Sequence, residues 1–387
     1  MGESAKKEIV ILGSTGSVGR SALEVIRALP DRFRVAGLCA CSRWELLAEQ
    51  IREFQPRVAV LADEGHRSDM QKAVSDVSTE MRWGRAEVTE LAGLEHVDVV
   101  VSAIAGGAGL PAAMRALENG QTLALANKES LVMGGHLLMD LTEEHGGRIL
   151  PVDSEHSAIF HALHSGSASD LKRVIITASG GPFYGVDEEE LKEVTPEEAL
   201  AHPTWNMGKK ISIDSATMMN KALEVIEARW LFDLDPEKID VVIHPQSVVH
   251  SMVEFADGAV IAQMAVPDMK LPLQYALTYP DHVEGPVKPL DLTEAGPLEF
   301  CEASEDDFPA LRLAYRVARE GGTTGAVVSA ADEAAVAGFL KGRLRFTEIV
   351  KCVEKILDLH TPVEEPSLEQ VLQAAEWARE ETYKWFN

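Results

Sequence analysis

The first 150 residues alternate short apolar runs with segments that have helical spacing. In the segment 19–29, apolar residues recur three and four positions apart, as they do on one face of a helix. The apolar runs lie at residues 8–12, 33–40, 57–62, 97–105 and 121–127. Strands that alternate with helices are typical of a parallel, doubly wound sheet. We therefore predict an α/β protein whose N-terminal domain, residues 1–150, is Rossmann-like.

The pattern changes after residue 150. Residues 173–180 predict a strand, and residues 214–232 predict one helix that begins near Asp214 or Ser215. Two further apolar runs are joined at Asp257-Gly258, which predicts a β-hairpin. Together they indicate a central α+β catalytic domain with an antiparallel sheet. The predicted boundaries are 151–285 for this domain, 286–300 for a linker rich in Pro and Gly, and 301–387 for a C-terminal helical bundle of four helices.

The composition of the chain indicates which binding partners and which cellular compartment to expect. The formal net charge of −26 disfavours nucleic acid and anionic membranes, because both require a basic surface. No apolar run approaches the roughly 18 residues of a membrane span. The N-terminus enters a strand almost at once, so we expect a cytoplasmic protein without a targeting peptide. The four cysteines are too few and scattered for a disulfide framework, and we expect reduced packing residues.

A glycine-rich loop joins the first strand to the first helix. Gly13, Gly16 and Gly19 permit a tight turn and close approach to a pyrophosphate at the helix N-terminus. Three spaced glycines alone are weak evidence for a binding site. Their position between a strand and a helix favours a dinucleotide-binding loop over a glycine-rich turn that binds no ligand. The second strand ends at Ser42 and Arg43 with no acidic residue, which favours the 2′-phosphate of NADPH over NADH. The alternative is that Arg43 is a solvated loop cation.

Three segments carry candidate chemistry. Lys128 follows a strand at the edge where ligands bind in doubly wound sheets. Asp153 and Glu155 are two positions apart, so in extended chain their side chains share one face. Two carboxylates on one face suit a hard cation such as Mg²⁺ or Mn²⁺. The plainer alternative is a solvated acidic turn. Asn220 and Glu224 share a helical face with Lys221 beside them, and Ser215 is expected at the helix start, where anions bind. Alone, this third segment also fits a capped amphipathic helix with an ordinary ion pair.

These residues closely resemble one enzyme family over nearly the whole chain. The blocks GSTGSVG, ANKES, VDSEHSAIF, TASGGPF, HPTWNMGKKISIDSATMMNKALEVIEARWLF, HPQSVVHSMVEF and VPDMKLP occur in order. They are similar to 1-deoxy-D-xylulose 5-phosphate reductoisomerases. The resemblance implies a homodimer that uses NADPH and Mg²⁺ or Mn²⁺, with Co²⁺ a further candidate, to convert that sugar phosphate to 2-C-methyl-D-erythritol 4-phosphate in non-mevalonate isoprenoid biosynthesis.

The resemblance also implies site residues. Its metal ligands are Asp153, Glu155 and Glu224, and its catalytic residues are Lys128, Glu155 and His202. The substrate residues that it implies are Lys128, Ser154, Ser179, His202, Ser215, Asn220 and Lys221. We also expect the metal ligands Glu155 and Glu224 to contact substrate, and Trp205, an indole in the predicted lid, to cover it. The cofactor residues that it implies are Thr15, Gly16, Ser17, Val18, Asn127, Glu129 and Gly208, and they join Gly13, Gly19, Ser42 and Arg43, which we predict from the glycine-rich loop and the end of the second strand.

The chain departs from the family pattern at two places. Residues 41–43 differ from the Gly-Lys-Asn-like form of some members, which leaves the detail of 2′-phosphate binding open. Asp332 and Ser329 replace two asparagines in a segment that we expect to be structural, with little effect on catalysis.

The residues fit the expected chemistry. A metal ion that binds the carbonyl and hydroxyl oxygens of an α-hydroxyketone polarises both oxygens. The carbon skeleton of the substrate then rearranges by an α-ketol or a retroaldol–aldol route. NADPH reduces the aldehyde that this rearrangement produces. Lys128 assists electrostatically or in proton transfer. Residues 179–209, with a glycine hinge, predict a lid that excludes water.

Two other classes of protein share part of this pattern. Semialdehyde dehydrogenases share a similar glycine loop but need a nucleophilic cysteine in the second domain, and residues 151–285 contain none. An NADPH-sensing regulator of the same fold would have no reason to gather three carboxylates and two lysines. Oxidation of NADPH in the presence of substrate separates the enzyme from the regulator.

Overall fold

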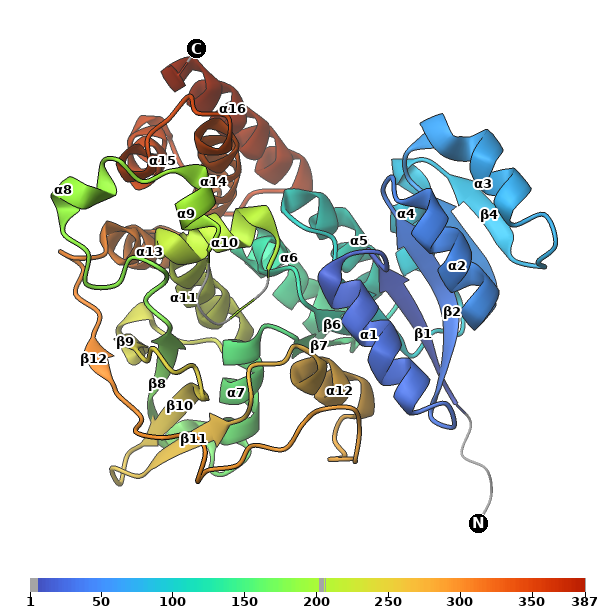
Figure 1. The fold of residues 1–387 in the computed structure, drawn as a ribbon, viewed down its shortest axis with the longest axis horizontal. Helices are drawn as coiled ribbons and strands as arrows, with labels where there is room; N and C mark the ends of the chain where they lie inside the picture. The colour runs from blue at the N-terminus through green and yellow to red at the C-terminus, as the bar shows by residue number, and fades with distance from the viewer. Residues whose placement is uncertain (1–5, 202–204, 206, 387) are drawn as a thin grey trace. The chain divides into compact units, whose positions relative to one another are not determined.

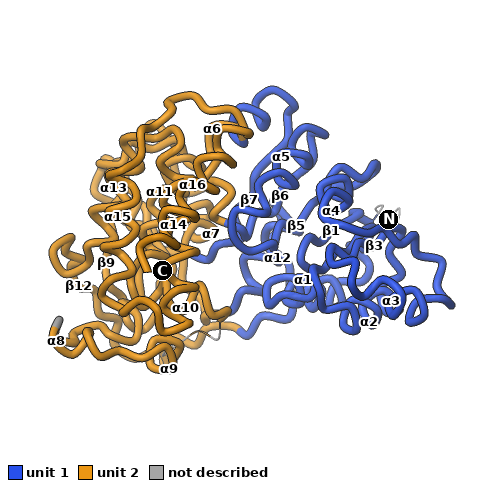
Figure 2. The backbone as a smooth tube through the Cα atoms, turned by 90° about the horizontal axis from the view of Figure 1, so that it is seen from above, with its two compact units in different colours: residues 1–127, 138–154, 268–288 blue, residues 128–137, 155–267, 289–387 orange. Residues whose placement is uncertain are grey.

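The computed structural model describes residues 6–201, 205 and 207–386 (Figure 1). Contacts between Cα atoms divide the chain into two compact units, neither of which is continuous in sequence (Figure 2). Unit 1 comprises residues 1–127, 138–154 and 268–288, and unit 2 comprises 128–137, 155–267 and 289–387. The three-domain division remains a prediction, and these units cross its boundaries, since 268–288 joins the N-terminal part.

Unit 1 contains a parallel sheet with the order β4-β3-β2-β1-β5-β6-β7 among the described residues. Every neighbouring pair runs parallel, which confirms the doubly wound, Rossmann-like prediction. The strands are β1 (Lys7–Leu12), β2 (Phe33–Ala40), β3 (Val58–Leu61), β4 (Glu80–Trp83), β5 (Val99–Ser102), β6 (Thr122–Leu125) and β7 (Arg148–Pro151). The central strand β1 is wholly shielded over Ile9–Leu12, as expected for a strand covered on both faces.

Helices connect these strands. They are α1 (Ser17–Ala28), α2 (Trp44–Phe54), α3 (Arg67–Ala73), α4 (Arg85–Ala92) and α5 (Leu110–Glu118). The later helix α12 (Lys270–Thr278) also belongs to unit 1, where it packs against α1. Neither β4 nor α12 was predicted, because β4 has only four residues and α12 is short and contains Pro272.

Helix α6 (Lys128–His145) contributes to both units and is interrupted by non-helical backbone at Gly134. Its first half packs tightly in unit 2. A Cβ on Gly135 would lie 2.3 Å from the Trp230 ring, and one on Gly325 would lie 1.9 Å from the carbonyl oxygen of Val132. Side chains at these glycines would force the backbones apart, so the glycines fix the part of α6 that begins with Lys128.

Unit 2 contains a mixed sheet of order β11-β10-β8-β9-β12 among the described residues. Its strands are β8 (Leu171–Ala178), β9 (Ile239–Ile243), β10 (Val249–Phe255), β11 (Val260–Met264) and β12 (Cys301–Glu302). The hairpin predicted at Asp257-Gly258 joins β10 to β11. The prediction of an antiparallel sheet is correct except for β8 and β9, which run parallel.

Most helices of unit 2 lie above this sheet in the view of Figure 1 and continue to the C-terminus. They are α7 (Ser154–Leu163), α8 (Glu188–Leu191), α9 (Pro196–Ala199), α10 (Lys209–Ala216), α11 (Met219–Leu231), α13 (Pro309–Glu320), α14 (Thr324–Leu340), α15 (Ile349–Leu359) and α16 (Leu368–Phe386). The last four confirm the predicted C-terminal helices. None of the described helices combines the length and apolarity that a bilayer crossing requires.

Two local predictions were wrong. The helix predicted over 214–232 is broken into α10 and α11, because Met218 adopts a left-handed conformation with φ of 61°. All four cysteines are free, as predicted, but only Cys39 and Cys352 are buried packing residues. Cys41 and Cys301 are exposed because each lies at the end of a strand rather than within one face of the core.

Candidate functional site

In unit 1, the glycine-rich loop forms a tight turn between β1 and α1. Gly13 has a φ of 82°, and a Cβ there would lie 2.5 Å from the carbonyl oxygen of Ala103. A Cβ on Gly19 would lie 2.3 Å from the carbonyl oxygen of Gly13. Gly16 is the N-cap residue of α1, so Ser17 and Val18 follow in its first turn. The loop thus presents the N-terminus of α1, a site that suits a phosphate group.

Arg43 lies at the end of β2 beside this loop. Its Nη1 donates a hydrogen bond to the carbonyl oxygen of Thr15 over 3.1 Å. Ser42 next to it is exposed. Residues 42 and 43 thus follow β2 beside the glycine-rich loop, where we expect the cofactor ribose.

Strand β6 delivers three further predicted residues. Asn127 donates to the carbonyl oxygen of Gly106 over 3.0 Å within unit 1. Lys128 and Glu129 form the first turn of α6 in unit 2, and Lys128 is buried with 5% exposure. Lys128 therefore follows the end of β6, as the sequence predicted, and begins α6, which it did not predict.

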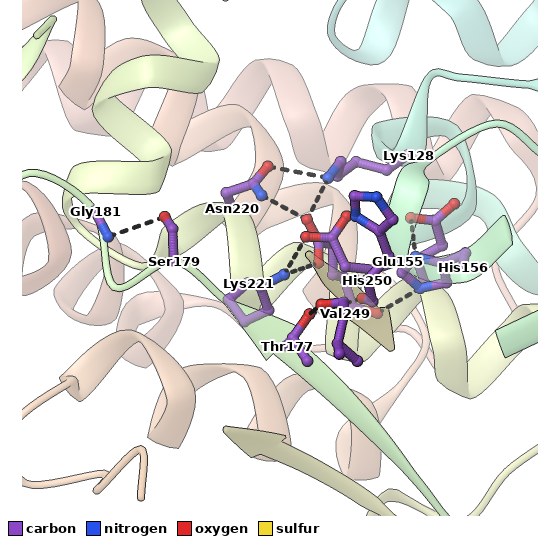
Figure 3. Close-up of polar contacts among 12 residues, drawn as sticks. Lys128, Glu155, His156, Thr177, Ser179, Gly181, Asn220, Lys221, Val249 and His250 are labelled. Carbon is purple, nitrogen blue, oxygen red and sulfur yellow. Dashed lines mark hydrogen bonds and ion pairs between the residues drawn. The ribbon is translucent and has the colours of Figure 1, made fainter. Parts of the chain in front are cut away.

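One face of α11 gathers the predicted polar side chains (Figure 3). Lys128 Nζ lies 3.0 Å from Asn220 Oδ1 and 2.8 Å from Glu224 Oε1. Asn220 Nδ2 also donates to Glu224 Oε1 over 2.5 Å. Glu224 is 1% exposed, so its charge depends on these donors. The shared face of Asn220 and Glu224 is confirmed.

Glu155 reaches the same group from α7. Lys221 Nζ lies 2.8 Å from Glu155 Oε1 and also contacts Glu224 Oε2. The extended conformation expected for Asp153 to Glu155 is wrong, because α7 begins at Ser154 and places Glu155 in its first turn. Ser154 is thus the first helical residue, and Asp153 immediately precedes it.

The group is electrically balanced within unit 2. Two carboxylates, Glu155 and Glu224, face two ammonium groups, Lys128 and Lys221, and hydrogen bonds link all four. Burial alone would lower the pKa of Lys221, but the charges of Glu155 and Glu224 outweigh burial and raise it. Lys221 is therefore an ammonium ion at neutral pH. The donor set, carboxylate and amide oxygen, is one that Mg²⁺ and Mn²⁺ prefer.

Sequence reasoning assigned no role to His156 and Glu227, which lie beneath this group. His156 Nε2 lies 2.9 Å from the carbonyl oxygen of Glu224, and His156 Nδ1 lies 3.5 Å from Glu227 Oε2. Both side chains are almost wholly buried. The signal in the sequence was the spacing of Glu224 and Glu227, which puts two acids on neighbouring positions of one helical face.

Ser179 and Ser215 are brought close by a glycine. Gly181, with a φ of 72°, donates its N–H to Ser179 Oγ over 3.2 Å, and a Cβ on Gly181 would lie 2.7 Å from the carbonyl oxygen of Ser215. Ser215 lies in the last turn of α10, not at a helix start as predicted, because the break at Met218 ends that helix early. Both hydroxyl-bearing residues nevertheless belong to segments that touch.

His250 is a second residue that the predicted list lacked. It is buried, and Thr177 Oγ1 lies 2.7 Å from its carbonyl oxygen. Burial lowers the pKa of His250 and outweighs the opposing charge of Glu155. The ring centroid of Trp205 lies 6.3 Å from that of His250. His202 lies outside the described residues, and Gly208 is the exposed N-cap residue of α10.

Comparisons with known proteins agree with one another over nearly the whole chain. Residues 9–135 match the family model of 1-deoxy-D-xylulose 5-phosphate reductoisomerase. Residues 149–232 match that of the 1-deoxy-D-xylulose 5-phosphate reductoisomerase C-terminal domain, and residues 264–381 match that of the DXP reductoisomerase C-terminal domain.

Individual proteins give the same picture. A relative of that name from Prosthecochloris aestuarii is 50% identical over 374 residues, covering 97% of this chain and 98% of its own. A solved reductoisomerase from Zymomonas mobilis in complex with NADPH is 42% identical, with a TM-score of 0.93 over 99% of this chain and 100% of its own. A solved DOX-P reductoisomerase in complex with NADPH, fosmidomycin and magnesium is 38% identical, with a TM-score of 0.91 over 98% of each chain.

Proposed function

Because the chain belongs to the 1-deoxy-D-xylulose 5-phosphate reductoisomerase family, we propose that it converts this sugar phosphate to 2-C-methyl-D-erythritol 4-phosphate with NADPH and a divalent cation. The observation that carries the proposal is the convergence of Glu155, Glu224, Lys128 and Lys221 on one face of α11. A buried set of two acids and two lysines can hold both a cation and an anionic substrate. The solved relatives in complex with NADPH, fosmidomycin and magnesium support the cofactor and the metal.

The proposed metal ligands are Asp153, Glu155 and Glu224. The carboxylates of Glu155 and Glu224 are both within reach of Lys221 Nζ, so each lies close enough to share one cation. When bound, Mg²⁺ or Mn²⁺ would supply Lewis-acid polarisation of the substrate carbonyl and hydroxyl oxygens. Asp153 joins this set through its place directly before α7 in the chain.

The proposed phosphate site comprises Ser179, Ser215, Asn220 and Lys221. Lys221 supplies the charge, and the serine hydroxyls and the amide of Asn220 supply hydrogen bonds. Lys221 is held within unit 2 by two carboxylates, so its ammonium is oriented before a substrate arrives. His202 and Ser154 are further proposed substrate contacts.

Lys128 is the group we propose to act on the reacting oxygens. It is the side chain that donates to both Asn220 and Glu224, which places a charged donor where negative charge develops on the substrate oxygens. The Trp205 ring lies 6.3 Å from that of His250, and Trp205 belongs to the segment 179–209 that we propose as a lid. The skeletal step proceeds by an α-ketol or a retroaldol–aldol route.

The proposed cofactor site is the loop Gly13 to Gly19 with Ser42, Arg43, Asn127, Glu129 and Gly208. Arg43 already lies against this loop through Thr15, so a 2′-phosphate at the end of β2 would find a guanidinium beside it. This supports preference for NADPH.

We also propose a cytoplasmic homodimer with a contact over residues 241–266. Strand β11 is an edge of the five-stranded sheet among the described residues, and its Val260 is 48% exposed. An edge with an exposed apolar residue is a surface that pairing with a second copy would cover.

The test is turnover of 1-deoxy-D-xylulose 5-phosphate with NADPH and Mg²⁺, followed as loss of NADPH absorbance. A phosphonate joined to a hydroxamate by three carbons should compete with substrate, since its oxygens match both the chelating pair and the phosphate. Its binding should require a divalent cation. NADPH binding without any turnover would instead indicate a cofactor-sensing regulator, and inhibitor binding in excess chelator would contradict the metal site.

A further inference from the structure

A buried histidine holds the backbone where β10 begins. His244 is wholly buried in unit 2, and the backbone N–H groups of Val248 and Val249 both donate to its Nε2, each over 3.1 Å. Its Nδ1 lies 2.8 Å from the carbonyl oxygen of Glu299. Because Nε2 accepts two N–H groups, the ring proton lies on Nδ1, which donates to Glu299. The surrounding backbone thus fixes one neutral tautomer of His244.

A buried hydroxyl group holds the carbonyl groups of the same segment. Thr177 Oγ1, on β8, lies 2.8 Å from the carbonyl oxygen of Val249 and 2.7 Å from that of His250. In a regular strand, successive carbonyl groups point to opposite edges, so one hydroxyl does not reach two of them. The backbone at Val249 and His250 is therefore irregular, and side chains from two other positions bond to it.

The irregularity is a β-bulge centred on His250. In the pairing of β10 with β11, Val249 lies opposite Met264 and Ser251 lies opposite Gln263, so His250 is the extra residue. A bulge bends its strand and changes the direction of the side chains there, and bulges are frequent beside active sites. The backbone held by His244 and Thr177 thus determines where the His250 imidazole points.

The His250 ring lies beside the proposed site. It is buried, its centroid lies 6.3 Å from that of the Trp205 ring, and it hydrogen-bonds the backbone of Val266. Burial lowers the pKa of His250, the charge of Glu155 opposes that shift and the charge of Lys221 adds to it. Figure 3 shows His250 among these side chains. The ring is therefore close to the groups that we propose to bind the cation and the phosphate.

We propose that His244 and Thr177 are positioning residues for the reaction, which together hold the bulge at the start of β10 so that the His250 imidazole faces the substrate. The inference deepens the proposed function and rests on it, since it places His250 on the substrate side of the site. Both residues act through the backbone of β10. Their loss should impair the reaction of the sugar phosphate but not NADPH binding, because the loop proposed for the cofactor belongs to unit 1.

His244→Asn tests the contact at Nε2. The shorter amide keeps a donor near the position of Nδ1, where it bonds Glu299, but it does not reach the N–H groups of Val248 and Val249. The kcat/KM for the sugar phosphate should fall roughly ten- to a hundredfold, as for a displacement of about 1 Å near the reacting groups. His244→Gln is the rescue variant, because its amide oxygen reaches the position of Nε2, and its kcat/KM should stay within about threefold of the wild type.

Thr177→Val and Thr177→Ser form an independent pair. Valine keeps the shape and removes the hydroxyl, so its kcat/KM should fall, whereas serine keeps the donor and should stay near the wild type. This pair decides the proposal if His244→Asn does not fold. Gln246→Ala is the matched control: Gln246 lies in the turn after His244 and bonds the side chain and backbone of Glu299. Its loss should leave kcat/KM within about twofold of the wild type.

A double-mutant cycle separates positioning from general stabilisation. If His244 acts through His250, His244→Asn should change kcat/KM by less than about twofold in a His250→Ala background, so the two losses should not add. A residue that only stabilises the fold lowers activity by the same factor in both backgrounds. The dissociation constant for NADPH, measured by fluorescence titration without substrate, should stay within about twofold in every single variant. Thr177→Val replaces His244→Asn in the cycle if the latter does not fold.

The outcomes are distinct. Equal activities of His244→Asn and His244→Gln overturn the proposal, or of the two Thr177 variants if that pair is used. Losses that add in the double variant, or NADPH binding that weakens in parallel with kcat/KM, also overturn it. Wild-type protein that turns over the sugar phosphate while these variants keep full activity leaves the proposed function intact and defeats the positioning role alone. Wild-type protein that shows no turnover would defeat the proposed function instead.

Discussion

Lys128 Nζ lies 2.8 Å from Glu224 Oε1, although the two residues are 96 positions apart in the chain. The pair joins the first turn of α6 to the middle of α11 within unit 2. Glu224 thus serves two functions: it neutralises two buried lysines, and we propose that it binds the cation.

Glu224→Gln should abolish metal-dependent turnover, with a fall of roughly a hundredfold or more, because one carboxylate of the metal site is lost. Neutralising Glu224 also removes a carboxylate that both buried ammonium groups, Lys128 and Lys221, contact. The thermal midpoint measured by calorimetry should therefore fall. Near-normal activity at low Mg²⁺ would contradict the assignment.

Arg43→Ala should weaken NADPH binding by about 1.5–3 kcal/mol, the range for a hydrogen bond to a charged group, with little change for NADH. The reason is that Arg43 lies at the end of β2, against Thr15 of the glycine-rich loop. Titration of the variant with each cofactor checks this. Equal losses for the two cofactors would assign Arg43 to loop structure rather than to the 2′-phosphate.

Asp214→Asn should change how stability depends on pH. Burial, followed by the charges of Asp332 and Glu129, raises the pKa of Asp214 well above its usual value, and Lys210 opposes the shift only in part. An acid whose pKa is raised in the folded state favours folding at low pH, and that contribution is lost as pH rises through the folded pKa. From about pH 4 upward, the wild type should therefore lose thermal stability relative to Asp214→Asn.

Glu237→Gln is a control of opposite sign. The hydrogen bond from Arg319 lowers the pKa of Glu237, so the wild-type advantage over this variant should be present above about pH 4.5 and disappear as pH falls. A difference between wild type and Asp214→Asn that does not vary with pH would show that Asp214 has no raised pKa.

Trp205→Ala should lower turnover while leaving the thermal midpoint nearly unchanged. The centroid of the Trp205 ring lies 6.3 Å from that of the His250 ring, and His250 belongs to β10. If the indole covers bound substrate, its loss affects closure rather than folding. A large fall in the midpoint with unchanged turnover would instead make Trp205 an anchor of the segment.

Light scattering at micromolar concentration should give about twice the chain mass of 42.1 kDa, because pairing would cover the exposed edge of β11. Val260→Lys, at an exposed position of that strand, should shift the mass toward the monomer. A fully active wild-type monomer would exclude the predicted assembly.

The sequence predicted the parallel sheet, the C-terminal helices and the shared face of Asn220 and Glu224 because each depends on local periodicity. It did not predict the break at Met218, since a non-glycine residue with positive φ is set by tertiary packing rather than by propensity. That break also explains why Ser215 ends one helix instead of beginning another.

Contacts between distant segments were likewise beyond local reasoning. The Lys210–Asp332 pair joins positions in different helices, and no spacing rule links them. The same holds for His156 with the backbone of Glu224. The extended chain predicted from Asp153 to Glu155 was wrong, although an Asp directly before the helix start at Ser154 is a typical N-cap residue that the sequence already offered.

The burial of Lys128 and Lys221, 5% and 3% exposed, has a kinetic consequence. Their charge is shared with adjacent carboxylates and is not projected into solvent, whereas the chain as a whole carries a net charge of −26. An approaching sugar phosphate therefore meets repulsion at long range and attraction only on arrival. Added salt screens the long-range field more than the buried contacts, so encounter quickens as ionic strength rises, the reverse of the usual behaviour of a phosphate-binding protein with a basic surface.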